Sequence, residues 1–417
     1  MTERAEKFWL DFRERGMYTE RIYERLFELA SNPIEIYSFT KAYLENYHSG
    51  STLFDASLSY ISKGQFEELL EIALVILKKR ENELAQSVIY YAILQFPELM
   101  TENLNEVLEL YNEKYYNWSI TPGRNFEEIQ IEKLLAKFLR TDISKIEKQK
   151  IFEVLIQTRN LPSIEIAFKY ALENNLFESL YPMEDLITHI ECVGLTMKEN
   201  TIVSYCPNIA YHFVFPKNYF SKNEPIWLDN KSEHPTWKFK ASTKSFKFGG
   251  YLEKDLKNPF YHIITFDIIP EGIKVTNLKM LTLGLHINLL NEQFGPFFYT
   301  HDAYGKPSLI NNGINYEIKY FDDDEYKERE VAFAQTPSRW RIQDWGMANS
   351  RENLFRLGGE PTAIQSPEVL ICPNCKGKMD FFMQLDTGGD FFWGTGGICY
   401  IYWCDKDKVS GYCFQCT

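Results

Sequence analysis

The sequence predicts an α+β protein in which an all-helical first half precedes a β-rich second half. Apolar residues recur at helical spacing up to about residue 195. Beyond that point, short aromatic and β-branched runs alternate with Pro, Asn and Gly. At 417 residues the chain also exceeds the size at which one hydrophobic core stops growing. We therefore expect an α-helical repeat domain at 1–195 and a β-rich domain at 196–417.

The first half reads as one amphipathic helix after another. Segment 66–77 keeps apolar residues at i, i+3 and i+4, and the stripe in 84–96 ends at Pro97, which cannot continue a helix. Similar stripes follow within 104–111, 129–138, 151–155 and 164–172. Helical hairpins recur roughly every 30 to 40 residues, which favours a HEAT-like array. An irregular helical domain fits the same pattern equally well.

The second half contains four runs typical of strands. They lie at 210–215, 261–266, 316–321 and 398–403, and each is rich in aromatic or β-branched residues.

A faint internal duplication runs through this half. Segments 245–250 (SFKFGG) and 354–359 (LFRLGG) share one hydrophobic pattern, and each precedes an extended run that ends in Asp, at 260–267 and 379–386. We expect two duplicated sheets, at about 200–325 and 326–417, unless the similarity is chance. The paired glycines are then expected where the backbone needs positive φ or close approach. They are Gly249, Gly250, Gly358 and Gly359.

Composition narrows the class of partner. The formal net charge of −13 argues against direct binding of nucleic acid and favours a basic protein. The acidic run 322–325 is interpreted as a solvated loop.

The beginning of the chain does not resemble a signal peptide, and no apolar stretch approaches the length of a membrane span. We expect a cytoplasmic protein with no membrane partner.

Six of the eight cysteines follow residue 370. Cys372 and Cys375 form a Cys-x-x-Cys knuckle followed by Gly377, an arrangement that presents two thiolates to one tetrahedral Zn²⁺. Cys413 and Cys416 repeat the spacing, but residues three apart on a strand face opposite sides. Cys372, Cys375, Cys404 and Cys413 are therefore the predicted ligands of one structural zinc ion. Buried thiols that fill a core are the alternative.

The same residues resemble the YwqG-like domain, which is related to the C-terminal domain of eukaryotic programmed cell death protein 2. The matching stretches are 234–237 (HPTW), 248–250 (FGG), 299–302 (YTHD), 356–361 (RLGGEP), 372–375 (CPNC), 379–385 (MDFFMQL) and 400–404 (YIYWC). The resemblance spans about residues 200–417 and implies a duplicated β-sheet fold without established catalysis. Members often have a second cysteine three residues after the one matched by Cys404, and Asp407 stands there in this chain.

Two further groups are candidates for function. His301 beside Asp302 could be a general base, although a histidine hydrogen-bonded in the turn that leads to Gly305 is the favoured interpretation. Phe391, Phe392 and Trp393 lie among glycines and could be partner-binding anchors, with core packing as the alternative.

These observations favour a protein-binding factor without catalysis, which is chaperone-like or adaptor-like. In this hypothesis a basic segment is bound in the seam between the two related sheets, with the glycine pairs and the aromatic loop as partner-binding residues. The resemblance also implies an alternative, an immunity protein that neutralises a toxin. A zinc-dependent or His301-based hydrolase is the third hypothesis.

Overall fold

The computed structural model describes most of the chain in two compact units, and the boundary falls between Ser204 and Tyr205. The residues outside the description are 1, 17–18, 20–21, 111–122, 124–125, 177–182, 200, 218, 221–234, 255–258, 287–295, 311–325, 344, 346–347, 349–351, 366, 392, 394–395 and 417. The predicted strand at 316–321 and the acidic run 322–325 lie among them.

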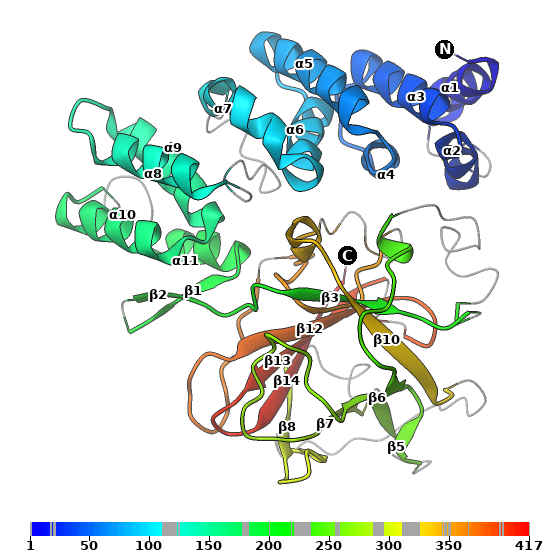
Figure 1. Ribbon diagram of the computed structural model, residues 1–417, viewed down its shortest axis with the longest axis vertical. Coiled ribbons are helices and arrows are strands. Elements are labelled where there is room, and N and C mark those ends of the chain that lie inside the picture. Colours follow the sequence, from blue (N-terminus) through cyan, green and yellow to red (C-terminus); the bar gives the residue numbers. More distant parts are fainter. Residues whose placement is uncertain are drawn as a thin grey trace. The chain divides into compact units, whose positions relative to one another are not determined.

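Helices make up nearly all of the described first unit (Figure 1). They are α1 (Glu3–Arg15), α2 (Ile22–Ala30), α3 (Pro33–Asn46), α4 (Thr52–Leu58), α5 (Lys63–Lys79), α6 (Glu83–Gln95), α7 (Pro97–Leu110), α8 (Glu128–Leu139), α9 (Lys145–Thr158), α10 (Leu161–Glu173) and α11 (Met183–Cys192). The helical stripes expected from the sequence lie along α5 to α10, so these helices are confirmed. Tyr111, at the end of one stripe, lies outside the described residues.

Side-chain caps explain where several helices begin. Ser62 and Gln65 form a capping box at the start of α5. Asn82 accepts a hydrogen bond from the Ala85 amide at the start of α6, and Ser144 caps α9 in the same way. Such caps satisfy amides that the helix itself leaves unbonded.

The first unit ends later than the sequence predicts. Strands β1 (Leu195–Lys198) and β2 (Thr201–Ser204) form an antiparallel hairpin. Leu195 and Ile202 of this hairpin are buried in the same hydrophobic cluster as α8 to α11. The hairpin therefore completes the helical core, and the boundary lies after Ser204 rather than at about residue 195.

The second unit contains the remaining strands. They are β3 (Ala210–Val214), β4 (Phe246–Phe248), β5 (Tyr251–Glu253), β6 (Phe260–Phe266), β7 (Leu281–Leu285), β8 (Phe297–His301), β9 (Pro307–Leu309), β10 (Arg329–Gln335), β11 (Arg356–Gly358), β12 (Asp380–Asp386), β13 (Ile398–Cys404) and β14 (Val409–Gln415). The runs expected at 210–215, 261–266 and 398–403 coincide with β3, β6 and β13, so these strands are confirmed.

The described strands of this unit form one antiparallel sheet rather than two separate ones. Its order is β5-β6-β4-β10-β3-β11-β12-β13-β14-β8-β9, and β7 pairs with β6. The earliest strand, β3, lies between β10 and β11, and β10 in turn lies beside β4. β3 comes from the first half of the unit's sequence and pairs with two strands of the second half. β10 comes from the second half and pairs with two strands of the first half.

Strands β6 and β12 each contain a β-bulge. The pairing of β6 with β7 shifts between His262 and Ile264. The pairing of β12 with β13 shifts between Phe381 and Met383. Each bulge bends its strand and strengthens the local twist.

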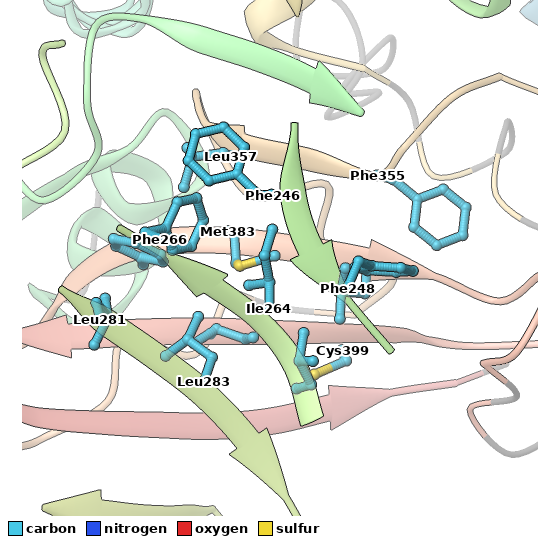
Figure 2. Packing of buried hydrophobic residues seen from close by; sticks show 14 of the residues in the cluster. Phe246, Phe248, Ile264, Phe266, Leu281, Leu283, Phe355, Leu357, Met383 and Cys399 are labelled. Carbon is cyan, nitrogen blue, oxygen red and sulfur yellow. The ribbon is translucent and has the colours of Figure 1, made fainter. Parts of the chain in front are cut away.

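The two halves of the sheet share one interior. Figure 2 shows the core side chains of β4, β6 and β7 gathered with those of β11, β12 and β13. Phe246, Phe248, Phe266 and Leu357 are among the members, and each is at least nine-tenths buried. Aromatic rings of this size bury large apolar areas, so this cluster is the main source of hydrophobic stability in the unit.

The described helices include none with the length and apolar character needed to cross a membrane.

Candidate metal centre

A tight loop holds the first two cysteines of the candidate site. The Cys372 amide donates to the Gly377 carbonyl (2.9 Å), and the Lys376 amide donates to the Cys372 carbonyl (3.0 Å). Lys376 has a φ of 61°, which closes the turn. This loop, residues 371–378, is called the knuckle below, and it is flanked by a β-bridge between Ile371 and Lys378.

The other two members come from the hairpin that joins β13 to β14. Cys404 is the last residue of β13 and pairs with Val409, the first residue of β14. Asp407 lies in the turn between them, and Lys408 closes it with a φ of 52°. Cys404 and Asp407 are therefore held by one short turn.

The knuckle and the hairpin bring four ligand atoms together, all within 4.8 Å of one another. The Cys375 and Cys404 sulfurs are 3.7 Å apart. An Asp407 carboxylate oxygen lies 3.2 Å from the Cys372 sulfur and 3.7 Å from the Cys404 sulfur. A tetrahedral zinc site with ordinary bond lengths has sulfur–sulfur edges of about 3.8 Å and sulfur–oxygen edges of about 3.5 Å. The set could hold a metal ion, and its spacing fits zinc.

Burial opposes ionisation of the Cys372 and Cys404 thiols when no cation is bound. Desolvation raises the pKa of Cys372, and it raises the pKa of Cys404 to about 12. Hydrogen bonds from the Cys375 and Cys372 thiols lower the pKa of Asp407. A divalent cation reverses this balance, because thiolates coordinate it and release their protons.

Cys413 does not belong to this set, which corrects the predicted ligands. It pairs with Tyr400, whereas Cys404 pairs with Val409. Cys413 lies four steps along the strand from Val409, a distance of roughly 13 Å. Cys413 is buried, and desolvation raises its pKa well above the usual range. Asp407 takes the fourth place in the cluster instead.

His301 lies in a closed environment. Its Nδ1 faces the Gly305 carbonyl at 3.1 Å, and its Nε2 faces the Ser410 hydroxyl at 2.8 Å. The ring is 7% exposed, and burial lowers its pKa to about 4. Because both ring nitrogens are engaged by buried groups, the geometry matches a histidine fixed in a turn rather than a general base.

All four paired glycines adopt positive φ, as the sequence predicts, with values between 70° and 81°. Neighbouring backbone covers them closely. A Cβ on Gly249 would lie 2.7 Å from the Lys327 carbonyl oxygen, and a Cβ on Gly358 would lie 2.4 Å from the Ile209 carbonyl oxygen. Gly250 and Gly359 are buried in the same way. The pairs therefore serve packing within the sheet, and their assignment as partner contacts is corrected.

The aromatic loop is likewise internal. Phe391 and Trp393 are 2% and 3% exposed, and their rings stack with centroids 5.2 Å apart. Phe392 lies outside the described residues. The two described rings therefore pack in the core, which is the alternative considered for this loop. They are not exposed anchors.

The sequence did not predict the buried polar network around Arg356. Arg356 is fully buried, and its guanidinium donates to the Trp340 carbonyl (3.2 Å), to Gln343 and Gln384 (both 3.3 Å) and to the Glu360 carbonyl. Only the basic residue before the glycine pair hinted at it.

No family model, curated protein or solved structure matches the chain.

Proposed function

We propose that this chain is a non-catalytic protein-binding factor whose β-rich unit is stabilised by one structural zinc ion. The observation behind the zinc ion is the set of three sulfurs and one carboxylate oxygen within 4.8 Å of one another. Four protein ligands complete a tetrahedral site and leave no position for a substrate, which is the arrangement of structural zinc.

The absence of catalysis is supported by the surroundings of the other candidate. His301 is held between Gly305 and Ser410 and is shielded from solvent. A general base must reach the proton that it removes from a substrate. A hydrolase based on His301 therefore has no support in the described residues.

A basic protein segment is the proposed partner. The chain has 58 acidic and 45 basic residues, which gives the net charge of −13. An excess of negative charge speeds the encounter with a Lys/Arg-rich segment and rejects acidic competitors. The helical half would widen the binding surface as a HEAT-like array, and successive packing of α5 on α6 and of α8 on α9 supports this.

We also propose that the β-rich unit is a duplicated domain of the YwqG-like type. Two matching features support the duplication: a positive-φ glycine pair directly after β4 and at the end of β11, and a bulge at the same place in β6 and β12. The 260–267 and 379–386 alignment made from the sequence places these two bulges opposite each other.

Binding of defined peptides to the metal-loaded full chain tests the partner proposal. We expect a Lys/Arg-rich peptide to bind in isothermal titration calorimetry at low salt, and its Asp/Glu-rich counterpart not to bind. Affinity should fall as salt rises, because exposed charges are screened. Failure of both peptides, together with no protein copurifying at low salt from the native cell, contradicts the proposal.

Metal analysis tests the zinc ion separately. One zinc per chain, retained on dialysis and lost from a Cys375→Ser variant, is the expected result. A chain purified with zinc available that holds no metal contradicts this part of the proposal.

A further inference from the structure

Four loops meet at one end of the β-rich unit. The His301 amide donates to the Lys408 carbonyl (2.9 Å), which places the β8–β9 turn beside the β13–β14 turn. The Thr276 amide donates to Asp405 of the same turn (2.8 Å), and the metal centre joins the knuckle to it. The loops are 274–280, 302–306, 371–378 and 405–408, and together they are called the lysine end below.

The charge of the lysine end is opposite to that of the whole chain. Its loops contain seven lysines and three aspartates, with no glutamate or arginine. The lysines are Lys274, Lys279, Lys306, Lys376, Lys378, Lys406 and Lys408. Zinc with three thiolates adds one negative charge, so a positive excess remains.

The aspartates of the lysine end are bonded locally. Asp302 accepts hydrogen bonds from the Tyr304 and Lys306 amides, at 2.8 and 2.9 Å. Asp405 accepts from Thr276 and from the Trp403 indole. Asp407 faces the thiols of the metal centre. These carboxylates hold the turns in shape. The Lys376 ammonium group donates to the Pro373 carbonyl within the knuckle (2.7 Å).

Most of the lysines lack a carboxylate partner. Lys274 and Lys306 have partners outside the lysine end, Asp380 and Glu253, each at 3.5 Å in an exposed pair. Such pairs contribute little. Four other lysines of this end form no ion pair with any residue that the structure describes. These are Lys279, Lys376, Lys406 and Lys408.

One exposed aromatic ring lies within this basic surface. Tyr304, at the tip of the β8–β9 turn, is 77% exposed, and Met280 of the neighbouring loop is 38% exposed. The two loops touch, because a Cβ on Gly305 would lie 2.0 Å from the Met280 carbonyl oxygen. A ring this exposed makes no use of its apolar area within the chain.

We propose that the lysine end binds single-stranded nucleic acid, with its lysines against the phosphates and Tyr304 stacked on a base. Lysines that surround an exposed aromatic ring are the combination used to bind single strands without sequence preference. An acidic peptide would satisfy the lysines but leaves the ring without a role. A duplex is disfavoured because the surface consists of turns and presents no helix or ribbon to a groove.

The proposal goes beyond the binding of a basic protein segment and does not depend on it. Net charge argues against nucleic acid for the chain as a whole, whereas the contact would be made by a local surface of opposite sign. Repulsion from the rest of the chain should make the binding weak at physiological salt.

Fluorescence anisotropy with the zinc-loaded full chain tests this proposal. The probe is a labelled oligothymidylate of about 12 nucleotides, titrated between about 50 and 200 mM salt. One variant replaces Lys279, Lys376, Lys406 and Lys408 with Gln. The matched control replaces Lys7, Lys63, Lys133 and Lys169, which are exposed lysines of the helical unit, so both variants lose the same charge.

We expect the first variant to lower affinity at least tenfold and to reduce the salt dependence by a slope of about 3, since fewer counterions are released. Tyr304→Ser should lower affinity about 5-fold to 100-fold and leave the slope unchanged. The control should change affinity by less than about twofold.

Four results would overturn the proposal. The first is no binding by the wild type at low salt, and the second is an equal loss in both lysine variants. The third is competition by an oligoglutamate peptide as effective as unlabelled oligothymidylate and insensitive to Tyr304→Ser, which would assign the surface to an acidic protein. The fourth is a lysine variant that regains binding when zinc is restored, which would show that the lysines serve only the metal. Zinc content is therefore measured for every variant.

Discussion

Lys247 and Arg356 occupy matching positions in β4 and β11, yet Lys247 is exposed and Arg356 is completely buried. Each stands two residues before the first glycine of a pair. Each also pairs with a residue just beyond a bulge, Thr265 for Lys247 and Gln384 for Arg356. The difference arises because hydrogen-bond acceptors surround the Arg356 guanidinium. They include the Trp340 and Glu360 carbonyls, the Gln343 side-chain amide and the Thr362 hydroxyl. Arg356 is thus the centre of a buried polar network, whereas Lys247 faces solvent.

Replacing Arg356 should destabilise the β-rich unit strongly. Burial lowers its pKa to about 10, so the guanidinium stays charged at neutral pH. In Arg356→Met the buried acceptors lose their donors, and we expect a loss on the order of 3 to 5 kcal/mol in urea unfolding. Lys247→Met should stay within about 0.5 kcal/mol. Equal effects of the two changes would contradict this account of the network.

The glycine pairs should tolerate no side chain. Gly358→Ala combines a φ of 70° with a Cβ only 2.4 Å from the Ile209 carbonyl oxygen. We expect it to cost at least about 2 kcal/mol of unfolding free energy. Gly64→Ala is the control, because Gly64 lies in α5 with open space around it, and a gain of up to about 1 kcal/mol is expected there. A tolerated Gly358→Ala would show that the close approach is not required.

His301 should make the protein less stable in mild acid. Its pKa falls from 6.5 to about 4 on folding, so between these values the unfolded chain binds the proton and the folded chain does not. Stability from this group is therefore complete above pH 6.5 and is lost as the pH falls toward 4. About 2 kcal/mol should disappear between pH 7 and 5. Urea midpoints of His301→Gln should show a shallower pH dependence than wild type, and an identical slope would contradict the assignment.

Lys148 should stabilise the end of α8. Its buried ammonium group donates to the carbonyls of Phe138 and Arg140 and to the Tyr170 hydroxyl (3.2 Å). Lys148→Met leaves these carbonyls without a donor, and we expect a loss of about 2 kcal/mol in thermal or urea unfolding. Lys145→Met changes an exposed residue at the start of α9 and should have little effect. Comparable losses would indicate a general effect of charge instead.

The ligand set of the metal centre can be read from Co²⁺ absorption. Wild type should show tetrahedral bands with charge transfer from three thiolates. Asp407→Cys should add a fourth thiolate ligand and tighten zinc binding at least tenfold. Cys404→Ser should lose metal, whereas Cys413→Ala should keep it despite some loss of packing. Retention by Cys404→Ser with loss by Cys413→Ala would restore the ligand set predicted from the sequence.

Local patterns in the sequence predicted the local structure well. The helix stripes, the strands β3, β6 and β13, and the positive φ of the glycine pairs all follow from periodicity and backbone sterics. The alignment of 260–267 with 379–386 also matched the bulge positions.

Features that depend on register or long-range pairing could not be predicted. Cys413 was misplaced because its distance from Cys404 depends on where the β13–β14 hairpin turns. The sequence left both partner-binding anchors and core packing open for Phe391 and Trp393, because their burial depends on Phe248 and Phe414, which are distant in sequence. The burial of Arg356 depends likewise on segments that no local pattern joins to it.

The exchange of β3 and β10 between the halves of the sheet determines how the protein can be divided. A fragment that stops before β10 leaves β4 without one neighbour, and a fragment that begins at β10 leaves β11 without β3. Each piece exposes an unpaired strand edge at the centre of the parent sheet, which invites aggregation or association with another chain. The two halves are therefore interlocked, and proteolysis of the connection between them should yield a nicked but still assembled unit.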